Sequence, residues 1–294
     1  VIDSCGMNSP VRSNLPEEFG IEKEVARNEK ITIYRAFFNK ASDEAVEAKF
    51  KVMLFAGGEL GVNWIASEDD HTDLLMGRFE DFTLEDVEKF SDFLRQTNPR
   101  LGTEIIRGGQ FVEIPVRQPL SVMVADGYAA IGDSAFMTVP LIGSGIANCL
   151  KASRVLANAV IADKNQSFTA ETLWKYQQGY YKELGAGLAP LACGKLLLLS
   201  LTPEEVDYVM DNGILNEDLM TIGADFTGLG SMNIDPRALI NQAKQVCQDP
   251  ELLKKIIACG VRMGKAVAAC AMMPKKYNAK RVRSWAKVYE FVYK

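Results

Sequence analysis

The chain has 294 residues, of which 48% are hydrophobic and 24% charged, so it has the composition of an ordinary globular protein of about two domains. This composition excludes a disordered tail, a collagen-like repeat and a small disulfide-bonded protein. The formal net charge of −5 argues against a general nucleic-acid-binding protein, because phosphate contacts need clustered cations. The six cysteines are scattered without a CxxC pair, and we therefore expect reduced thiols in a cytoplasmic protein.

A single histidine, His71, restricts the chemistry. A Ser-His-Asp site, a Cys-His site or a multi-histidine metal site would have to use it. It follows the acidic residues Glu68–Asp70, which could bind a cation but are more typical of a solvated hairpin loop. We expect no metal site, and chemistry that needs no histidine base.

Residues 31–116 have mainly β-type patterns. Strands are predicted at Ile31–Phe38, Lys49–Phe55, Val62–Ala66 and Asp73–Phe79, followed by a pair around Glu104–Val116 that Gly108-Gly109 separates. One helix is predicted between them, because Thr83 and Asp86 form a capping box before an apolar face.

From about residue 146 onward the pattern is almost wholly helical. Helix starts are predicted where a capping residue precedes proline or an amphipathic stretch, at Thr202-Pro203, Asp235-Pro236, Asp249-Pro250 and Asn278. The apolar run Leu184–Pro203 is interrupted by glycine and proline, so we expect buried or interfacial helices there rather than a membrane span. A β-rich first half followed by helices predicts a mixed α/β (α+β) fold.

The most informative segment begins with a turn at Asp126-Gly127 and a short predicted strand at Tyr128–Ile131. Gly132 and Asp133 follow, which places a carboxylate at the carboxyl end of the strand, where α/β sheets bind ligands. Such a carboxylate can accept strong hydrogen bonds from ligand hydroxyl groups.

A bare-backbone loop, Gly143-Ser144-Gly145, comes next and leads into a helix predicted for Ile146–Asp163. A glycine loop before a helix presents free N–H groups and a positive dipole end to a flat or anionic ligand. Together with Asp133, this predicts a site for a ring system on a polyol chain, a description that fits a flavin.

Residues Ile114–Val160 resemble the Gly-Asp motif and flavin-facing helix of FAD-dependent oxidoreductases with the p-hydroxybenzoate hydroxylase fold, most closely the geranylgeranyl reductase-like branch. The resemblance implies FAD as the cofactor and Asp133 as the residue that binds its ribityl chain. It also implies that the other cofactor contacts are Gly132, Pro140, Gly143, Ser144, Gly145, Ile146 and Ala147.

The first twelve residues resemble a second motif of this family, commonly Ala-Asp-Gly followed by Ser-x-Val-Arg. By the resemblance, Gly6, Ser9 and Arg12 belong to the cofactor site. Cys5 departs from the motif, because it stands where the family has aspartate. We expect Cys5 to be a buried structural residue, a redox-active thiol being the alternative.

The order of the motifs implies a domain organisation. In these flavoproteins a substrate domain is inserted between the two motifs. The resemblance therefore implies part of a Rossmann-like FAD-binding domain at residues 1–30 and 113–165, with a β-sheet substrate domain at 31–112 between them. A helical C-terminal region would follow at 166–294. Residues Gly57–Ile65 weakly resemble a hairpin whose tryptophan faces substrate, so Trp64 is either a substrate contact or part of the sheet core.

The family's strand–Gly-x-Gly-x-x-Gly–helix, which cradles the ADP half of FAD, is missing from the chain. Gly228-Leu229-Gly230 begins like it but lacks the third glycine. We expect either a natural start upstream of Val1 or a loss of FAD binding.

Three functions remain open. The first is an FAD-dependent oxidoreductase that reduces double bonds of an isoprenoid or other apolar substrate, using a reduced nicotinamide or a ferredoxin-type electron donor. The second is a flavin-dependent monooxygenase, and the third a non-catalytic remnant. The apolar stretches favour a long prenyl-like substrate. No catalytic residue is identified, and Tyr34 and Tyr128 are the candidates for a proton donor.

The C-terminal end is basic: seven of the last twenty residues are Lys or Arg and one is Glu. These cations could bind anionic lipid headgroups in a peripheral membrane contact, with Trp285 and Tyr289 at the interface. A solvated face on a packed helix is the commoner arrangement. The cations that could form this contact are Lys275, Lys276, Lys280, Arg281, Arg283 and Lys287.

Overall fold

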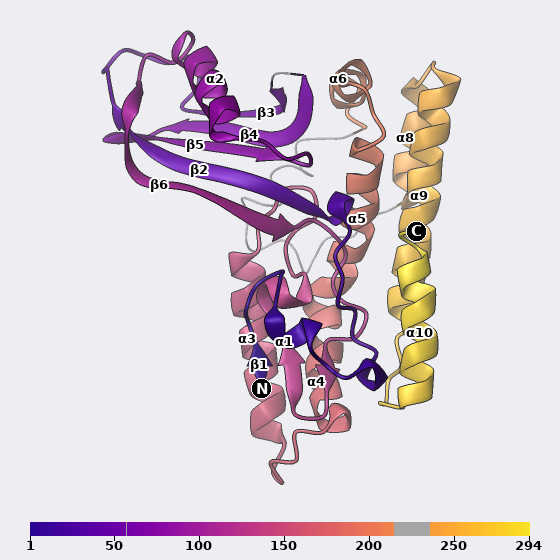
Figure 1. The fold of residues 1–294 in the computed structure, drawn as a ribbon. Helices are drawn as coiled ribbons and strands as arrows, with labels where there is room; N and C mark the ends of the chain where they lie inside the picture. The colour runs from indigo at the N-terminus through magenta and orange to yellow at the C-terminus, as the bar shows by residue number, and fades with distance from the viewer. Residues whose placement is uncertain (57, 215–235) are drawn as a thin grey trace. The chain divides into compact units, whose positions relative to one another are not determined.

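The computed structural model of the chain describes residues 1–56, 58–214 and 236–294 and divides into two units (Figure 1). Unit 1 comprises Val1–Glu24 and Pro115–Lys294, and unit 2 comprises Val25–Ile114. Gly57, Gly228-Leu229-Gly230 and Asp235, which the sequence analysis names, lie outside the described residues.

Unit 2 is built on a five-stranded sheet with the strand order β3-β4-β5-β2-β6. Its elements are η2 (Arg27–Glu29), β2 (Lys30–Lys40), β3 (Phe50–Ala56), β4 (Glu59–Ser67), β5 (His71–Arg78), α2 (Leu84–Arg95) and β6 (Leu101–Pro115). The pairs β3–β4, β4–β5 and β2–β5 are antiparallel. The four strands predicted between residues 31 and 79 are confirmed.

The predicted pair of strands around Glu104–Val116 is wrong, because β6 is one strand of 15 residues. Gly108 and Gly109 lie inside it with φ of 80° and 81°, so they distort the strand without reversing it. A Cβ at Gly108 would lie 2.6 Å from the carbonyl oxygen of Arg35 in the neighbouring strand β2. Glycine is therefore required by a close approach of two backbones and not by a turn.

Helix α2 covers one face of this sheet (Figure 1). The capping box predicted for Thr83 and Asp86 is present, since each side chain bonds the other residue's backbone N–H. The helix buries Val87, Phe90 and Leu94 against the strands, and the resulting core also holds Tyr34, Ala36, Phe38, Ile65, Leu74, Met76 and Leu101. Because side chains alternate along a strand, the neighbours of these residues point to the opposite face.

Unit 1 contains a small sheet in the order β1-β8-β7, formed by β1 (Ile2–Asp3), β7 (Val124–Ala125) and β8 (Tyr128–Ala130). Strands β1 and β8 are parallel, whereas β7 and β8 form an antiparallel hairpin. The predicted turn at Asp126-Gly127 is confirmed, with Gly127 at a φ of 70°. The sheet thus joins the beginning of the chain to the segment before Gly132.

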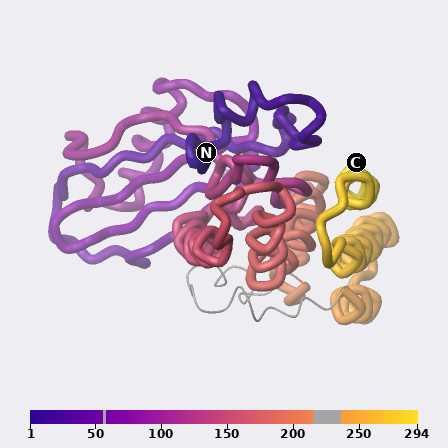
Figure 2. Tube along the Cα trace, turned by 90° about the horizontal axis from the view of Figure 1, so that it is seen from below, coloured from indigo at the N-terminus to yellow at the C-terminus, as the bar shows by residue number. Residues whose placement is uncertain are grey.

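The rest of unit 1 is helical, and Figure 2 views its long helices nearly end on. Its helices are α1 (Pro10–Ser13), η1 (Glu17–Phe19), η3 (Gly132–Ala135), α3 (Ile146–Ala162), α4 (Ala170–Tyr180), the π-helix η4 (Tyr181–Gly185), α5 (Ala186–Leu198), α6 (Pro203–Asp211), α8 (Pro236–Val246), α9 (Pro250–Ala271) and α10 (Ala279–Phe291). Helix α3 packs against α4, and α9 packs against α5, α8 and α10.

The local signals for these helices are confirmed. Thr202, Asp249 and Asn278 each cap the helix that follows with a side-chain oxygen. The apolar run around α5 is buried, as expected, with Leu188 and Leu191 almost inaccessible. Among the described residues, no helix combines the length and the apolar character that crossing a membrane requires.

Candidate cofactor site

Asp133 lies in the 3-10 helix η3, immediately after β8, at the carboxyl end of that strand as predicted. Among the described residues its carboxylate receives one hydrogen bond, from the Thr138 hydroxyl to Oδ1 at 3.2 Å. Burial raises the pKa of Asp133, and the bond from Thr138 lowers it by a smaller amount. Oδ2 is therefore left to accept hydrogen bonds from a ligand.

The glycine loop closes beside this carboxylate. The N–H groups of Val139 and Gly143 bond the carbonyl oxygens of Ser144 and Val139, both at 2.9 Å, and Gly143 has a φ of 71°. A Cβ at Gly145 would lie 3.4 Å from Oδ1 of Asp133 and 3.5 Å from the Thr138 hydroxyl. Gly145 therefore keeps the space beside the carboxylate clear.

Helix α3 begins directly after this loop, as predicted. Gly145 is its N-cap residue, no side chain caps it, and its first turn has no acidic residue. The first turn therefore directs uncapped N–H groups and a positive dipole end outward. Ile146 and Leu150 are 80% and 68% exposed there, so the start of α3 also offers an apolar surface.

Asp3 is the residue that the sequence analysis missed. It is fully buried, and its carboxylate accepts hydrogen bonds from the hydroxyls of Ser9 (2.6 Å), Tyr128 (2.8 Å) and Ser134 (3.1 Å) and from the N–H of Cys5 (3.0 Å). Burial alone would raise the pKa of Asp3, but these hydrogen bonds outweigh it and lower the pKa. The sequence did contain a signal for this residue: Asp3 is a carboxylate at the end of a short apolar strand and lies just before Gly6 of the family motif.

The structure brings the two sequence motifs together around Ser134. The carbonyl oxygen of Gly6 accepts a bond from the Ser134 hydroxyl at 3.2 Å, and Arg12 donates to the Ser134 carbonyl at 2.6 Å. Ser9 and Arg12 are buried. Arg12 bonds η3 directly, whereas Ser9 bonds Asp3, which accepts a further bond from Ser134 of η3. Their roles as cofactor contacts stay predictions.

Phe136, which ends η3, lies between two buried arginines. Its ring centroid is 4.6 Å from the guanidinium carbon of Arg12 and 4.5 Å from that of Arg117. Arg117 also forms an ion pair with Glu22 at 2.5 Å. Phe136 has a φ of 55°, a left-handed conformation that the chain adopts as it leaves η3. The two cation–π contacts stabilise Phe136 in this backbone conformation.

The expectation that Cys5 is buried is wrong, because Cys5 is exposed. Its N–H donates to the Asp3 carboxylate, and its thiol also interacts with that carboxylate. A hydrogen bond to Asp3 raises the pKa of the Cys5 thiol, which disfavours the thiolate that redox chemistry requires.

The two tyrosine candidates for a proton donor are buried. Tyr128 donates its hydroxyl proton to Asp3, and burial raises its pKa further. Tyr34 lies in the core of unit 2, where burial also raises its pKa. A role for either hydroxyl as a proton donor stays a prediction.

Trp64 lies in β4 next to Ile65 of the core, and alternation places it on the sheet face opposite α2. Its ring is 6.1 Å from that of Phe50 and 5.6 Å from the guanidinium carbon of Arg35, which is paired with Asp73. The indole N–H is buried and has no hydrogen-bond partner among the described residues. Trp64 is thus outside the core under α2.

His71 begins β5, so the hairpin loop before it consists of Glu68–Asp70 alone. Its Nδ1 lies 2.6 Å from a carboxylate oxygen of Asp70. Within the described ranges, no group of three or more histidine, cysteine or acidic residues is arranged to hold a metal ion.

No protein-family model matches the chain. The chain is 24% identical over 224 residues to the digeranylgeranylglycerophospholipid reductase of Sulfolobus acidocaldarius, which covers 74% of the chain and 49% of the relative. It is 29% identical over 118 residues to the enzyme of the same name from Methanothrix thermoacetophila, covering 40% of the chain and 29% of the relative. The chain thus spans half, or less, of the length of these curated relatives.

Among solved structures, the chain is similar to a geranylgeranyl bacteriochlorophyll reductase-like protein from Thermoplasma acidophilum. The TM-score is 0.62 at 17% identity, covering 88% of the chain and 61% of that protein. The chain therefore has the mixed α/β fold of this class of oxidoreductase. The resemblance to the geranylgeranyl reductase-like branch, found first in Ile114–Val160, is supported by all three similarities.

Proposed function

We propose that the protein is an FAD-dependent oxidoreductase that reduces carbon–carbon double bonds of a prenyl-type substrate. The observation that carries the proposal is the arrangement of the Asp133 carboxylate, the bare backbone of Gly145 and the uncapped start of α3 around one point. A carboxylate with a free oxygen suits the hydroxyls of a ribityl chain, and glycine backbone suits the flat face of a ring.

The residues present fit the flavin half of FAD. Asp133 would bind the ribityl chain, while Gly132, Pro140, Gly143, Ser144, Gly145, Ile146 and Ala147 would line the isoalloxazine. Bound FAD would supply the hydride. The chain's own residues would orient the ring, exclude water with the exposed apolar side chains of α3, and place a positive helix end where negative charge develops.

The names of the curated relatives support a reductase rather than a monooxygenase or a non-catalytic remnant. A prenyl chain is long and apolar, and Trp64, on the sheet face of unit 2 that α2 does not cover, is the proposed contact for it. The electron donor would be a reduced nicotinamide or a ferredoxin-type protein.

Peripheral membrane contact through α10 belongs to the same proposal. Val288 and Phe291 are 51% and 75% exposed, and they share one helix face with Lys280 and Lys287. A helix face that combines cations with exposed apolar groups suits a surface of anionic lipids that carries the prenyl substrate.

The reaction is tested under argon with chemically reduced protein, added FAD and geranylgeranyl diphosphate or a prenylated glycerophospholipid, followed by mass spectrometry. We expect a gain of about two mass units for each reduced double bond. An oxygen-dependent gain of about sixteen units would identify a monooxygenase instead. Unchanged substrate with fully bound flavin would contradict both enzymatic functions.

A further inference from the structure

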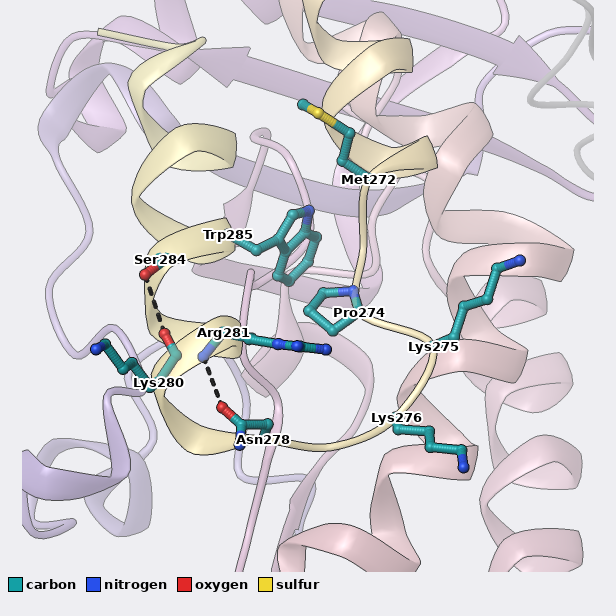
Figure 3. Close-up of a pocket in the computed structure, with 9 residues that line it drawn as sticks. All are labelled: Met272, Pro274, Lys275, Lys276, Asn278, Lys280, Arg281, Ser284 and Trp285. Carbon is teal, nitrogen blue, oxygen red and sulfur yellow. Dashed lines mark hydrogen bonds between the residues drawn. The ribbon is translucent and has the colours of Figure 1, made fainter.

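A second pocket lies at the junction of α9 and α10, away from the Asp133 site. The connecting residues 272–278 and the first turns of α10 border an open pocket with a volume of about 780 Å³ (Figure 3). Four cations line it, and Trp285 contributes an aromatic wall; no acidic side chain is among the lining residues. The cations are Lys275, Lys276, Lys280 and Arg281.

Among the described residues, none of these four cations has an acidic partner. No ion pair joins any of them to an acidic residue within the described part of the chain, whereas Lys255 and Arg154, elsewhere in unit 1, pair with glutamates at 2.7 and 2.8 Å. The first turn of α10 also lacks an acidic residue, and its N-cap is the neutral Asn278. The helix dipole therefore adds to the positive potential of the pocket.

The backbone of the pocket is held rigidly by the helices beneath it. The carbonyl oxygen of Pro274 accepts hydrogen bonds from the indole N–H of Trp174 at 2.8 Å and from the amide of Gln178 at 3.2 Å. The indole N–H of Trp285 donates to the carbonyl of Ala269 at 2.7 Å. A loop fixed in this way loses little conformational entropy when a ligand binds.

Figure 3 shows how the cations are arranged. Arg281 extends from α10 across the pocket toward the loop, and the lysine side chains extend outward from its rim. A guanidinium group presents paired donors that match two oxygens of a phosphate, while lysines act as mobile point charges. The paired guanidinium donors therefore favour an oxyanion with two acceptor oxygens, and the lysines add positive charge around it.

We infer that this pocket binds a phosphate or diphosphate group through Arg281 and the surrounding lysines. The group would come either from a lipid headgroup or from a soluble phosphorylated molecule. The inference is independent of the proposed reductase reaction, because none of the flavin-site residues lines the pocket, but it shares Lys280 with the proposed membrane contact through α10.

The test uses the full chain and three probes: inorganic pyrophosphate by calorimetric titration, and sedimentation with vesicles of phosphatidylglycerol or of phosphatidylcholine. The site variant combines Lys276→Gln with Arg281→Gln. The control variant combines Lys244→Gln with Lys265→Gln, which removes two exposed charges from α8 and α9 instead. Circular dichroism establishes that both variants are folded.

We expect the site variant to weaken binding of at least one anionic probe by about tenfold or more, since it removes charge-assisted hydrogen bonds, and the control to leave binding unchanged. Pyrophosphate binding without vesicle binding identifies a soluble ligand, and binding to phosphatidylglycerol alone identifies a lipid headgroup. Equal losses in both variants, equal binding to the two kinds of vesicle without any pyrophosphate binding, or no binding of any probe would overturn the inference. Flavin content and turnover do not enter these readouts.

Discussion

The hydroxyl of Tyr128 donates a 2.8 Å hydrogen bond to the buried carboxylate of Asp3, although the two residues are 125 positions apart in the chain. The bond joins the end of β1 to the start of β8. Because Ser134 of η3 bonds the same carboxylate, Asp3 also sets the position of the segment that carries Asp133. A buried carboxylate that is not among the predicted cofactor contacts thus helps to position the candidate site.

The first prediction measures this connection. Tyr128→Phe removes one donor to Asp3 and is expected to lower the free energy of unfolding by about 1.5–3 kcal/mol, the range for a hydrogen bond to a charged group. Asp3→Ala leaves three hydroxyl donors without their acceptor and is expected to cost more. Urea unfolding of the two single variants and of the double variant measures the coupling between Tyr128 and Asp3. Additive effects of the two substitutions would show that the hydrogen bond contributes nothing to stability.

The second prediction concerns pH, because the two aspartates respond in opposite directions. The pKa of Asp3 is lowered from 3.8, so its stabilising contribution is present above that pH and is lost as the pH falls through the lowered pKa. The pKa of Asp133 is raised from 3.8 by burial, so the stability linked to it is full below pH 3.8 and is lost as the pH rises through the raised pKa.

At neutral pH, Asp3→Asn is therefore expected to destabilise the protein and Asp133→Asn to stabilise it. Both differences from the wild type should shrink as the pH falls through the normal aspartate range. Urea unfolding at a series of pH values measures them. A stability gap for Asp133→Asn that does not change with pH would contradict the burial of its charge.

The third prediction is that Asp133→Ala reduces flavin affinity. Loss of charge-assisted hydrogen bonds to the ribityl chain is expected to reduce the binding free energy by about 1.5–3 kcal/mol, which corresponds to a dissociation constant roughly ten- to hundredfold larger. Fluorescence titration with FAD measures it. Asp207→Ala, which removes an exposed carboxylate on α6, is the matched control. Equal affinity of Asp133→Ala and the control would remove Asp133 from the site.

The fourth prediction distinguishes two reasons for a glycine: room for the ligand at Gly145, and a left-handed backbone conformation at Gly132. Gly145 has a φ of −127°, which any residue adopts, so Gly145→Val is expected to cost about 1 kcal/mol or less in stability while blocking the flavin ring. Gly132 has a φ of 65°, and a Cβ there would lie 3.1 Å from the Cys149 sulfur. Gly132→Ala is therefore expected to cost about 1–2 kcal/mol. Thermal unfolding and the visible flavin spectrum distinguish the two; a fully yellow Gly145→Val protein would contradict the placement of the ring.

The fifth prediction concerns Trp64. If its ring contacts a prenyl chain, Trp64→Ala raises KM for the prenyl substrate by about tenfold or more, because it removes an aromatic contact surface, and leaves FAD affinity unchanged. Trp64→Phe should retain most of the affinity for substrate. Unchanged KM in Trp64→Ala would show that the ring has only a structural role in the sheet.

Many helices and strands of this protein could be predicted from its sequence because they depend on local interactions. Thr83, Thr202, Asp249 and Asn278 mark helix starts correctly, because a cap depends on residues within one turn of the helix. The strand, carboxylate, glycine loop and helix of the candidate cofactor site are likewise consecutive in the chain. Their order was therefore predictable, and their arrangement follows from it.

Tertiary structure decided what depends on distant partners. Gly108-Gly109 has the sequence pattern of a turn, yet pairing with β2 keeps β6 extended through it. The role of Asp3 depends mainly on distant partners, because two of the three hydroxyls that bond it come from residues more than 120 positions away. Cys5 is exposed although its N–H bonds this buried carboxylate. The sequence by itself determined which local elements form. The buried carboxylate that holds the two motifs together exists only once long-range folding removes it from water and supplies its donors.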